Sequence, residues 1–376
     1  MSSDSSKKPR KKHFKISFKA VLSILALALV AFIVYRNWGD IVSAVDHIRE
    51  TNIFVLLLII PEQLLMLYSG GQIFFSYKES EEFEAPSESP TKTEKSPKPL
   101  TVIRISLESA FARQAYPSAG VSSAAFLSWR LKPYGFSPAQ TSFLYLLRYF
   151  AIVCTNQLQT LIAVLIILFT TDLSPAGQFI LILATIVAIV TGLFLAATIV
   201  LISSKRRISW FVDKATRFLN FFVRTVTRGK KRKIIDYDKV DAFLTELNGT
   251  YKIARKNMKI LKKPILWGMC YSFCEIATYW VVSISLGHPE LLPQIMIGEA
   301  VGSVAGIFLP YGLYELGMAG AMASLGVDLG LASLIVLITR VIVLGENLIP
   351  GYIVYQHTIL KTKAEGKTTY TPEKGA

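Results

Sequence analysis

The sequence predicts an all-α polytopic membrane protein, with six full spans and two re-entrant helical hairpins arranged as an inverted repeat. Three observations lead to this fold class: long apolar runs, the placement of Lys and Arg, and short apolar segments broken by Pro and Gly. The chain of 376 residues is 52% hydrophobic, and several apolar runs reach the roughly 20 residues that cross a hydrocarbon core about 30 Å thick. A membrane β-barrel is excluded, because its strands would alternate apolar and polar residues.

Positive charge marks the cytoplasmic side. The formal net charge is +15, and basic residues gather in 7–19 and 205–263 while the short loops between the other spans hold almost none. Because Lys and Arg stay inside, both termini and the long basic loop are expected in the cytoplasm of a plasma-membrane protein. The apolar runs favour attraction to anionic lipid over nucleic-acid binding, so no nucleic-acid partner is expected.

The first membrane half is predicted at 17–170. A disordered basic tail at 1–15 precedes an uncleaved span at 17–36, and the second span, 53–77, should kink at Pro61. A polar linker, 78–100, separates the second span from the first hairpin.

The predicted first hairpin is 101–133, with Pro117 at its tip. Each of its two runs is too short to cross, and both flanks are basic, which indicates a hairpin that enters from the cytoplasm; a pair of interfacial helices is the alternative. Ser137 and Pro138 then provide the N-cap and first residue of a long span, 139–170.

The second half, 178–359, repeats this plan. Its predicted parts are a span at 178–203, a cytoplasmic basic loop at 204–262, a span at 264–287, a re-entrant hairpin at 294–325 and a last span at 331–359, before a tail at 361–376. Three spans and one hairpin per half make the halves face opposite ways, which is an inverted repeat of the kind that supports alternating access.

Charged residues inside these apolar segments are the candidate site. A charge at membrane depth costs roughly 2.5–3.5 kcal/mol even on the lenient scale, so such residues are functional candidates. Similar intervals separate Glu, Pro and Arg in the two halves, which indicates an internal repeat. The candidates are Glu108, Arg113, Pro117, Arg148, Glu299, Pro310, Glu315, Arg340 and Glu346.

We hypothesise that Arg148 and Arg340 hold the phosphate of a lipid head group, because guanidinium binds phosphate in bidentate fashion. The alternative is that each Arg only pairs with a Glu between helices. No cofactor, metal site or catalytic nucleophile is expected. The cysteines lie in apolar runs as packing residues, and the histidines lie at span ends or tails.

Two motifs resemble a known family. The stretch Tyr116-Pro-Ser-Ala-Gly-Val-Ser-Ser to Gly135, followed by Arg148, is similar to the flippase-like transmembrane domain of lysylphosphatidylglycerol synthases. The stretch Pro310-Tyr-Gly-Leu-Tyr-Glu315 matches the family's second motif in part, being two residues shorter and poorer in glycine. The resemblance implies flipping of phospholipid or aminoacyl-phospholipid between leaflets, without the cytoplasmic domain that transfers the aminoacyl group.

The expected function is therefore a lipid flippase whose partners are anionic or aminoacylated phospholipids, and not an enzyme. Two alternatives stay open: a membrane subunit supporting a lipid-modifying or glycosyl-transferring enzyme, and a small-solute or ion transporter. The sequence leaves open a homodimer, the identity of the lipid, and the direction and energy source of transport.

Overall fold

The computed structural model describes residues 52–79, 97–115, 121–204, 206–207, 209–210, 212–214, 237–308 and 312–364. The predicted first span, 17–36, lies outside these residues, as do the N-terminal tail, most of the linker, both hairpin tips and most of the C-terminal tail. The described residues are helical throughout, joined by short turns.

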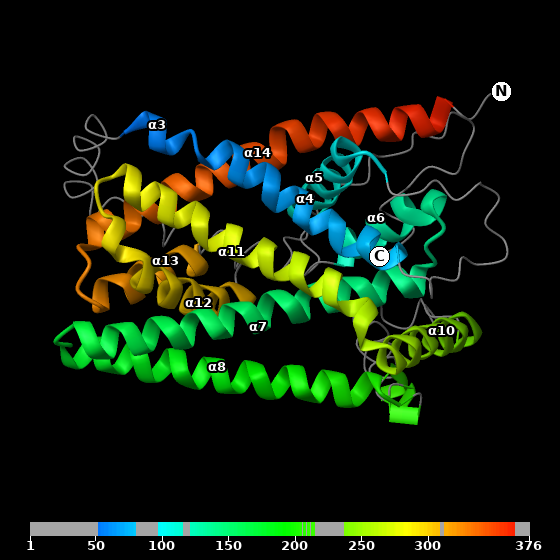
Figure 1. The fold of residues 1–376 in the computed structure, drawn as a ribbon, viewed down its shortest axis with the longest axis horizontal. Coiled ribbons are helices and arrows are strands. Elements are labelled where there is room, and N and C mark those ends of the chain that lie inside the picture. Colours follow the sequence, from blue (N-terminus) through cyan, green and yellow to red (C-terminus); the bar gives the residue numbers. More distant parts are fainter. Residues whose placement is uncertain are drawn as a thin grey trace, which may run out of the picture.

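Five helical segments in this part of the chain are long and apolar enough to cross a membrane. They confirm an all-α polytopic membrane protein and fall where five of the six spans were predicted. Their helices are α3 (Ile53–Leu56) with α4 (Ile59–Lys78), α7 (Pro138–Thr170), α8 (Pro175–Ile202), α11 (Lys262–Ser285) and α14 (Leu329–Ala364) (Figure 1).

Pairs of shorter helices lie at both predicted hairpins. The first pair is α5 (Pro99–Ala115) and α6 (Val121–Leu131), and the second is α12 (Leu292–Phe308) and α13 (Leu313–Ser324). The helices of each pair pack against each other. Which leaflet each hairpin enters from, and the inverted relation of the halves, stay predictions.

The ends of two spans follow local sequence rules. Ser137 caps α7 by accepting a hydrogen bond from the Gln140 backbone N–H at 3.0 Å, and the Gln140 side chain accepts a bond from the Ser137 N–H at 2.9 Å. The kink predicted at Pro61 is found just before this residue, where α3 ends and α4 begins. Because Pro61 has no N–H to donate to Leu57, the Leu57 carbonyl accepts from Ile60 at 3.1 Å, and α4 starts afresh at Ile59.

The turn after each hairpin has the same backbone conformation. Gly135 precedes α7 with φ +87°, and Gly326 precedes α14 with φ +94°. Only glycine adopts this left-handed region at no steric cost. The two turns support the internal repeat read from the sequence.

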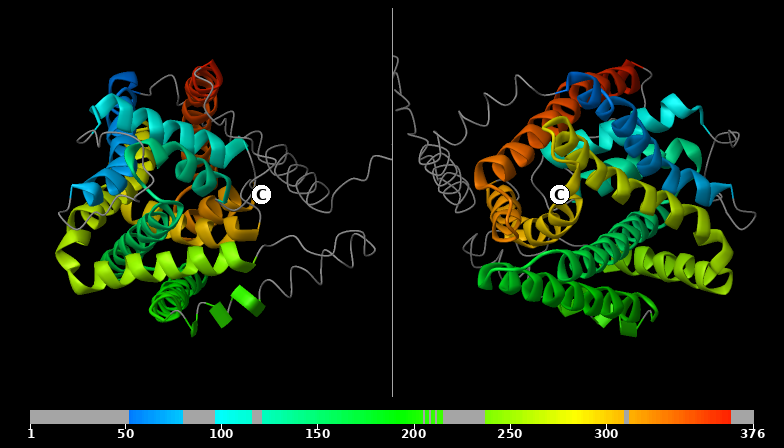
Figure 2. Two further views of the ribbon diagram at one scale, coloured as in Figure 1. Left: turned by 90° about the vertical axis from the view of Figure 1, so that its right-hand side faces the viewer. Right: turned by 60° about the vertical axis from the view of Figure 1, so that its left-hand side comes forward.

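The long helices form a bundle with an apolar outside. α7 and α8 lie together on one side, and α4 and α14 lie on the other (Figures 1 and 2). On α8, Phe179, Leu193 and Phe194 are each more than 60% exposed, as expected for side chains that face lipid.

One helix of the basic loop packs on the bundle. The last part of the predicted basic loop, 204–262, forms α10 (Tyr237–Lys256), then η2 (Met258–Leu261). Leu244 and Leu247 of α10 are buried in one apolar cluster with Phe143 and Leu147 of α7. Its apolar face is therefore covered by α7.

Candidate functional site

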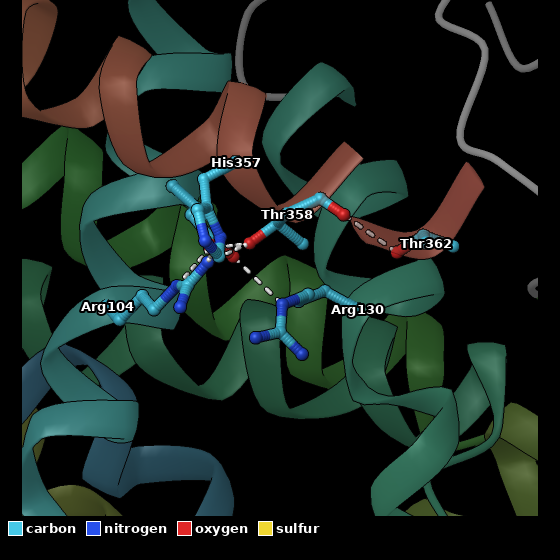
Figure 3. A network of polar contacts seen from close by, with 6 residues as sticks. Arg104, Arg130, His357, Thr358 and Thr362 are labelled. Carbon is cyan, nitrogen blue, oxygen red and sulfur yellow. Dashed lines mark hydrogen bonds and ion pairs between the residues drawn. The ribbon is translucent and has the colours of Figure 1, made fainter. Parts of the chain in front are cut away.

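Glu108 is the centre of a buried ion cluster. Its side chain is fully buried and accepts from Arg104 Nε at 3.0 Å and from Arg130 Nε at 2.8 Å. The Thr358 hydroxyl donates to it at 2.5 Å, and Arg104 also contacts His357 at 2.9 Å. Figure 3 shows Arg104, Arg130 and Thr358 converging on one point.

This cluster ties the first hairpin to the last span. Arg104 and Glu108 come from α5, Arg130 from α6, and His357 and Thr358 from α14. Both oxygens of the Glu108 carboxylate are occupied by these partners, so its charge is matched locally. Glu108 was predicted in the substrate site, and the structure gives it a structural pairing.

Arg113 and Arg148 line one cavity inside the first half. The cavity is small, with about 30 Å³ for the centres of water-sized molecules, and it is also lined by Ser106, Ser109 and Ser123. The Arg113 side chain is exposed. Among the described residues, neither arginine makes an ion pair or a hydrogen bond. Arg148 instead stacks on the Tyr271 ring at 4.4 Å.

Glu275 is a carboxylate inside the apolar helix α11. It is half-buried and is influenced electrostatically by Arg113, Arg148 and Arg340. Its helix packs against helices of both halves, α4, α7, α12 and α14.

Arg340 has its own carboxylate. Its Nε lies 2.8 Å from Glu315 Oε1, although the N–H does not point at that oxygen in hydrogen-bond geometry. Its guanidinium stacks on the Tyr314 ring at 4.1 Å. The other Glu315 oxygen accepts from the Gly312 N–H at 2.6 Å at the start of α13. Arg340 thus forms an ion pair with a Glu of another helix, the contact that the alternative hypothesis expects.

Glu299 is buried between α7 and α12. It accepts from the Ser303 hydroxyl at 2.5 Å and from the Asn156 amide at 3.4 Å. Asn156 in turn accepts from Ser272 of α11. A polar chain thus crosses three helices beside Arg340, with which Glu299 also interacts electrostatically.

The remaining predicted residues lie apart from these groups or outside the described chain. Glu346 is half-buried in α14, and its charge acts on Glu62 of α4. Pro117 and Pro310 lie outside the described residues.

Sequence reasoning missed Glu275 and the tyrosines that hold the arginines. Glu275 carried a usable signal, since it is a carboxylate inside an apolar run, the criterion that selected Glu299 and Glu315. Tyr271 and Tyr314 carried none, because tyrosines are common in membrane helices and only the fold shows which ring faces an arginine.

Metal and thiol chemistry find no support among the described residues. No group of three or more His, Cys, Asp or Glu is placed to hold a metal ion there. Cys154, Cys270 and Cys274 are free thiols. The described residues instead place three arginines and several carboxylates inside an apolar helical bundle.

Comparison with known proteins identifies the family. No curated protein and no solved structure matches the chain. The model of one family, described as the lysylphosphatidylglycerol synthase TM region, matches residues 17–351. This match covers both hairpins, the arginine cavity and Glu275, and the chain therefore belongs to the family of the lysylphosphatidylglycerol synthase TM region.

Proposed function

We propose that this protein moves phospholipid or aminoacyl-phospholipid between the leaflets of the plasma membrane, with both of its termini in the cytoplasm. The head group passes through the charged interior while the acyl chains stay in the bilayer. Membership of the family and the apolar helices support a role in lipid metabolism or transport. The substrates we expect are anionic or aminoacylated lipids.

One observation carries the proposal: Arg113 of α5 and Arg148 of α7 line one cavity and have no ion pair among the described residues. Arg340 of α14, in the other half of the chain, lies against Glu315. A polar head group would supply the missing negative charge.

The two arginines of the sequence-based hypothesis then act in succession. Arg148 faces an open cavity, whereas Arg340 is held by Glu315. A phosphate would bind Arg148 first, and would reach Arg340 only by displacing the Glu315 carboxylate. In this exchange the Arg340 guanidinium keeps an anionic partner throughout.

The test measures lipid movement by purified protein in vesicles. Fluorescent phosphatidylglycerol is placed in both leaflets. A membrane-impermeant quencher removes the fluorescence of the outer leaflet, so any loss beyond that share reports lipid that has moved out from the inner leaflet. Arg148→Gln and Arg340→Gln should abolish movement, while Lys263→Gln, at an exposed ion pair with Glu79, should leave it unchanged. Transfer at the wild-type rate in both arginine variants would refute the assignment.

The same assay separates the alternatives. Lipid movement only after adding a soluble enzyme would indicate a supporting subunit. Solute flux without lipid movement would indicate a solute or ion transporter.

A further inference from the structure

The cavity between α5, α6 and α7 has features that the expected function does not by itself require. Two guanidinium groups, Arg113 and Arg148, line it without an ion pair among the described residues. The side chains that line the cavity include these two arginines and no carboxylate, so its lining is positively charged.

The hydroxyl groups of the cavity add hydrogen-bond donors. Ser106 is more than nine-tenths buried, and its Oγ has no hydrogen-bond partner among the described residues. The hydroxyls of Ser109 and Ser123 form one hydrogen bond with each other at 2.6 Å. This bond uses the hydrogen of one hydroxyl, so the hydrogen of the other is available to donate to a ligand. A buried polar group without a partner costs free energy, and a bound anion would satisfy Ser106.

The glycines of α4 make room for this arrangement. A Cβ at Gly71 would lie 2.8 Å from Ser106 Oγ, and one at Gly70 would lie 3.6 Å from an Arg148 nitrogen. A Cβ at Gly71 would collide with the Ser106 hydroxyl, whereas one at Gly70 would be in ordinary contact with Arg148. The small volume of the cavity, about 30 Å³ for the centres of water-sized molecules, restricts it to a compact anion.

We propose that this cavity is a seat for a single phosphate group, bound by Arg113, Arg148 and Ser106 with a hydroxyl of the Ser109–Ser123 pair. Guanidinium and hydroxyl donors arranged around one point match the several oxygens of a tetrahedral phosphate better than a monoatomic anion or a carboxylate. That the phosphate belongs to a lipid head group rests on the proposed function. The binding itself does not depend on Arg340, which differs from the hypothesis drawn from the sequence.

Titration calorimetry of the full chain in phosphate-free maltoside micelles tests the seat. The probes are inorganic phosphate and dihexanoyl phosphatidylglycerol. Arg113→Gln and Arg148→Gln should each weaken binding of both at least about tenfold, the loss expected for one charge-assisted hydrogen bond. Lys263→Gln, at the exposed ion pair with Glu79, is the control and should bind both as wild type does.

Ser106→Ala tests the seat without the risk of misfolding, because the Ser106 hydroxyl has no hydrogen-bond partner among the described residues. It should weaken binding about threefold while the melting temperature stays unchanged. Wild-type affinity in Arg113→Gln, or an equal loss in Lys263→Gln, would overturn the seat. Binding of inorganic phosphate without the short-chain lipid would overturn the lipid assignment.

The outcome is distinguishable from failure of the proposed function. Phosphate and lipid binding that depend on Arg113, with no lipid movement in vesicles, would keep the seat and reject the flippase. Lipid movement that persists in Arg113→Gln, with unchanged binding, would reject the seat and keep the flippase.

Discussion

Replacing Glu108 by glutamine should destabilise the protein more than any other single charge removal among the ion pairs of the described residues. Glu108 is fully buried, while its partners Arg104 and Arg130 are 34% and 16% exposed. Glutamine keeps the shape and one acceptor oxygen but leaves two guanidinium groups without a carboxylate. Removing one partner of a buried pair costs about 3–5 kcal/mol, and the retained acceptor places this substitution near 3 kcal/mol.

The change is measurable as a melting temperature. At about 2 °C per kcal/mol for a large chain, Glu108→Gln should melt about 6 °C below wild type. A fluorogenic thiol dye reports unfolding in a Cys154→Ser, Cys270→Ser background, where the only thiol left is the buried one of Cys274 in α11. Lys263→Gln is the matched control: it breaks an ion pair whose partners are 68% and 40% exposed, worth about 0–1 kcal/mol. Equal melting of Glu108→Gln and wild type would refute the reasoning.

Three further substitutions test packing, backbone and pairing by the same melting assay. Gly71→Ala places a methyl group 2.4 Å from a valine of α5 and should cost about 1–3 kcal/mol, whereas Gly192→Ala, with nothing within 4 Å, should be neutral or slightly stabilising. Gly326→Ala should cost about 1–2 kcal/mol because its φ is +94°, whereas Gly345→Ala, also in open space, should not destabilise. Glu315→Gln keeps an acceptor at the start of α13 but loses the ion pair at 2.8 Å, and should cost about 1–3 kcal/mol. Equal melting temperatures for Gly71→Ala and Gly192→Ala would contradict the packing argument, and equal ones for Gly326→Ala and Gly345→Ala the backbone argument. Wild-type melting of Glu315→Gln would show that its ion pair does not stabilise the protein.

Features set by local sequence could be predicted. Length and hydropathy placed the ends of five spans within about five residues of the ends of the helices that form them. The cap at Ser137 and the break beside Pro61 result from single residues and their immediate neighbours. Such features need no knowledge of tertiary contacts.

The partners of the charges could not be predicted in the same way. Spacing along the chain put Glu108 and Glu299 at equivalent positions, yet Glu108 pairs with two arginines whereas Glu299 bonds to Ser303 and Asn156. One of these partners was visible, because Arg104 precedes Glu108 by four residues, one helical turn. Contacts such as that of Arg148 with Tyr271 join distant segments, so only the packing of α7 on α11 reveals them.

The ion cluster around Glu108 bears on how the protein is made. Glu108 and Thr358 are 250 residues apart, and at 5–20 residues per second the ribosome takes roughly 12–50 s to cover that distance. Until α14 has been synthesised, the first hairpin has only Arg104 and Arg130 to neutralise its acidic side chain, and the helix that closes over them does not yet exist. The contacts of Glu108 with α14 can therefore form only after the last helix has been synthesised, so the packing of an early hairpin is completed late.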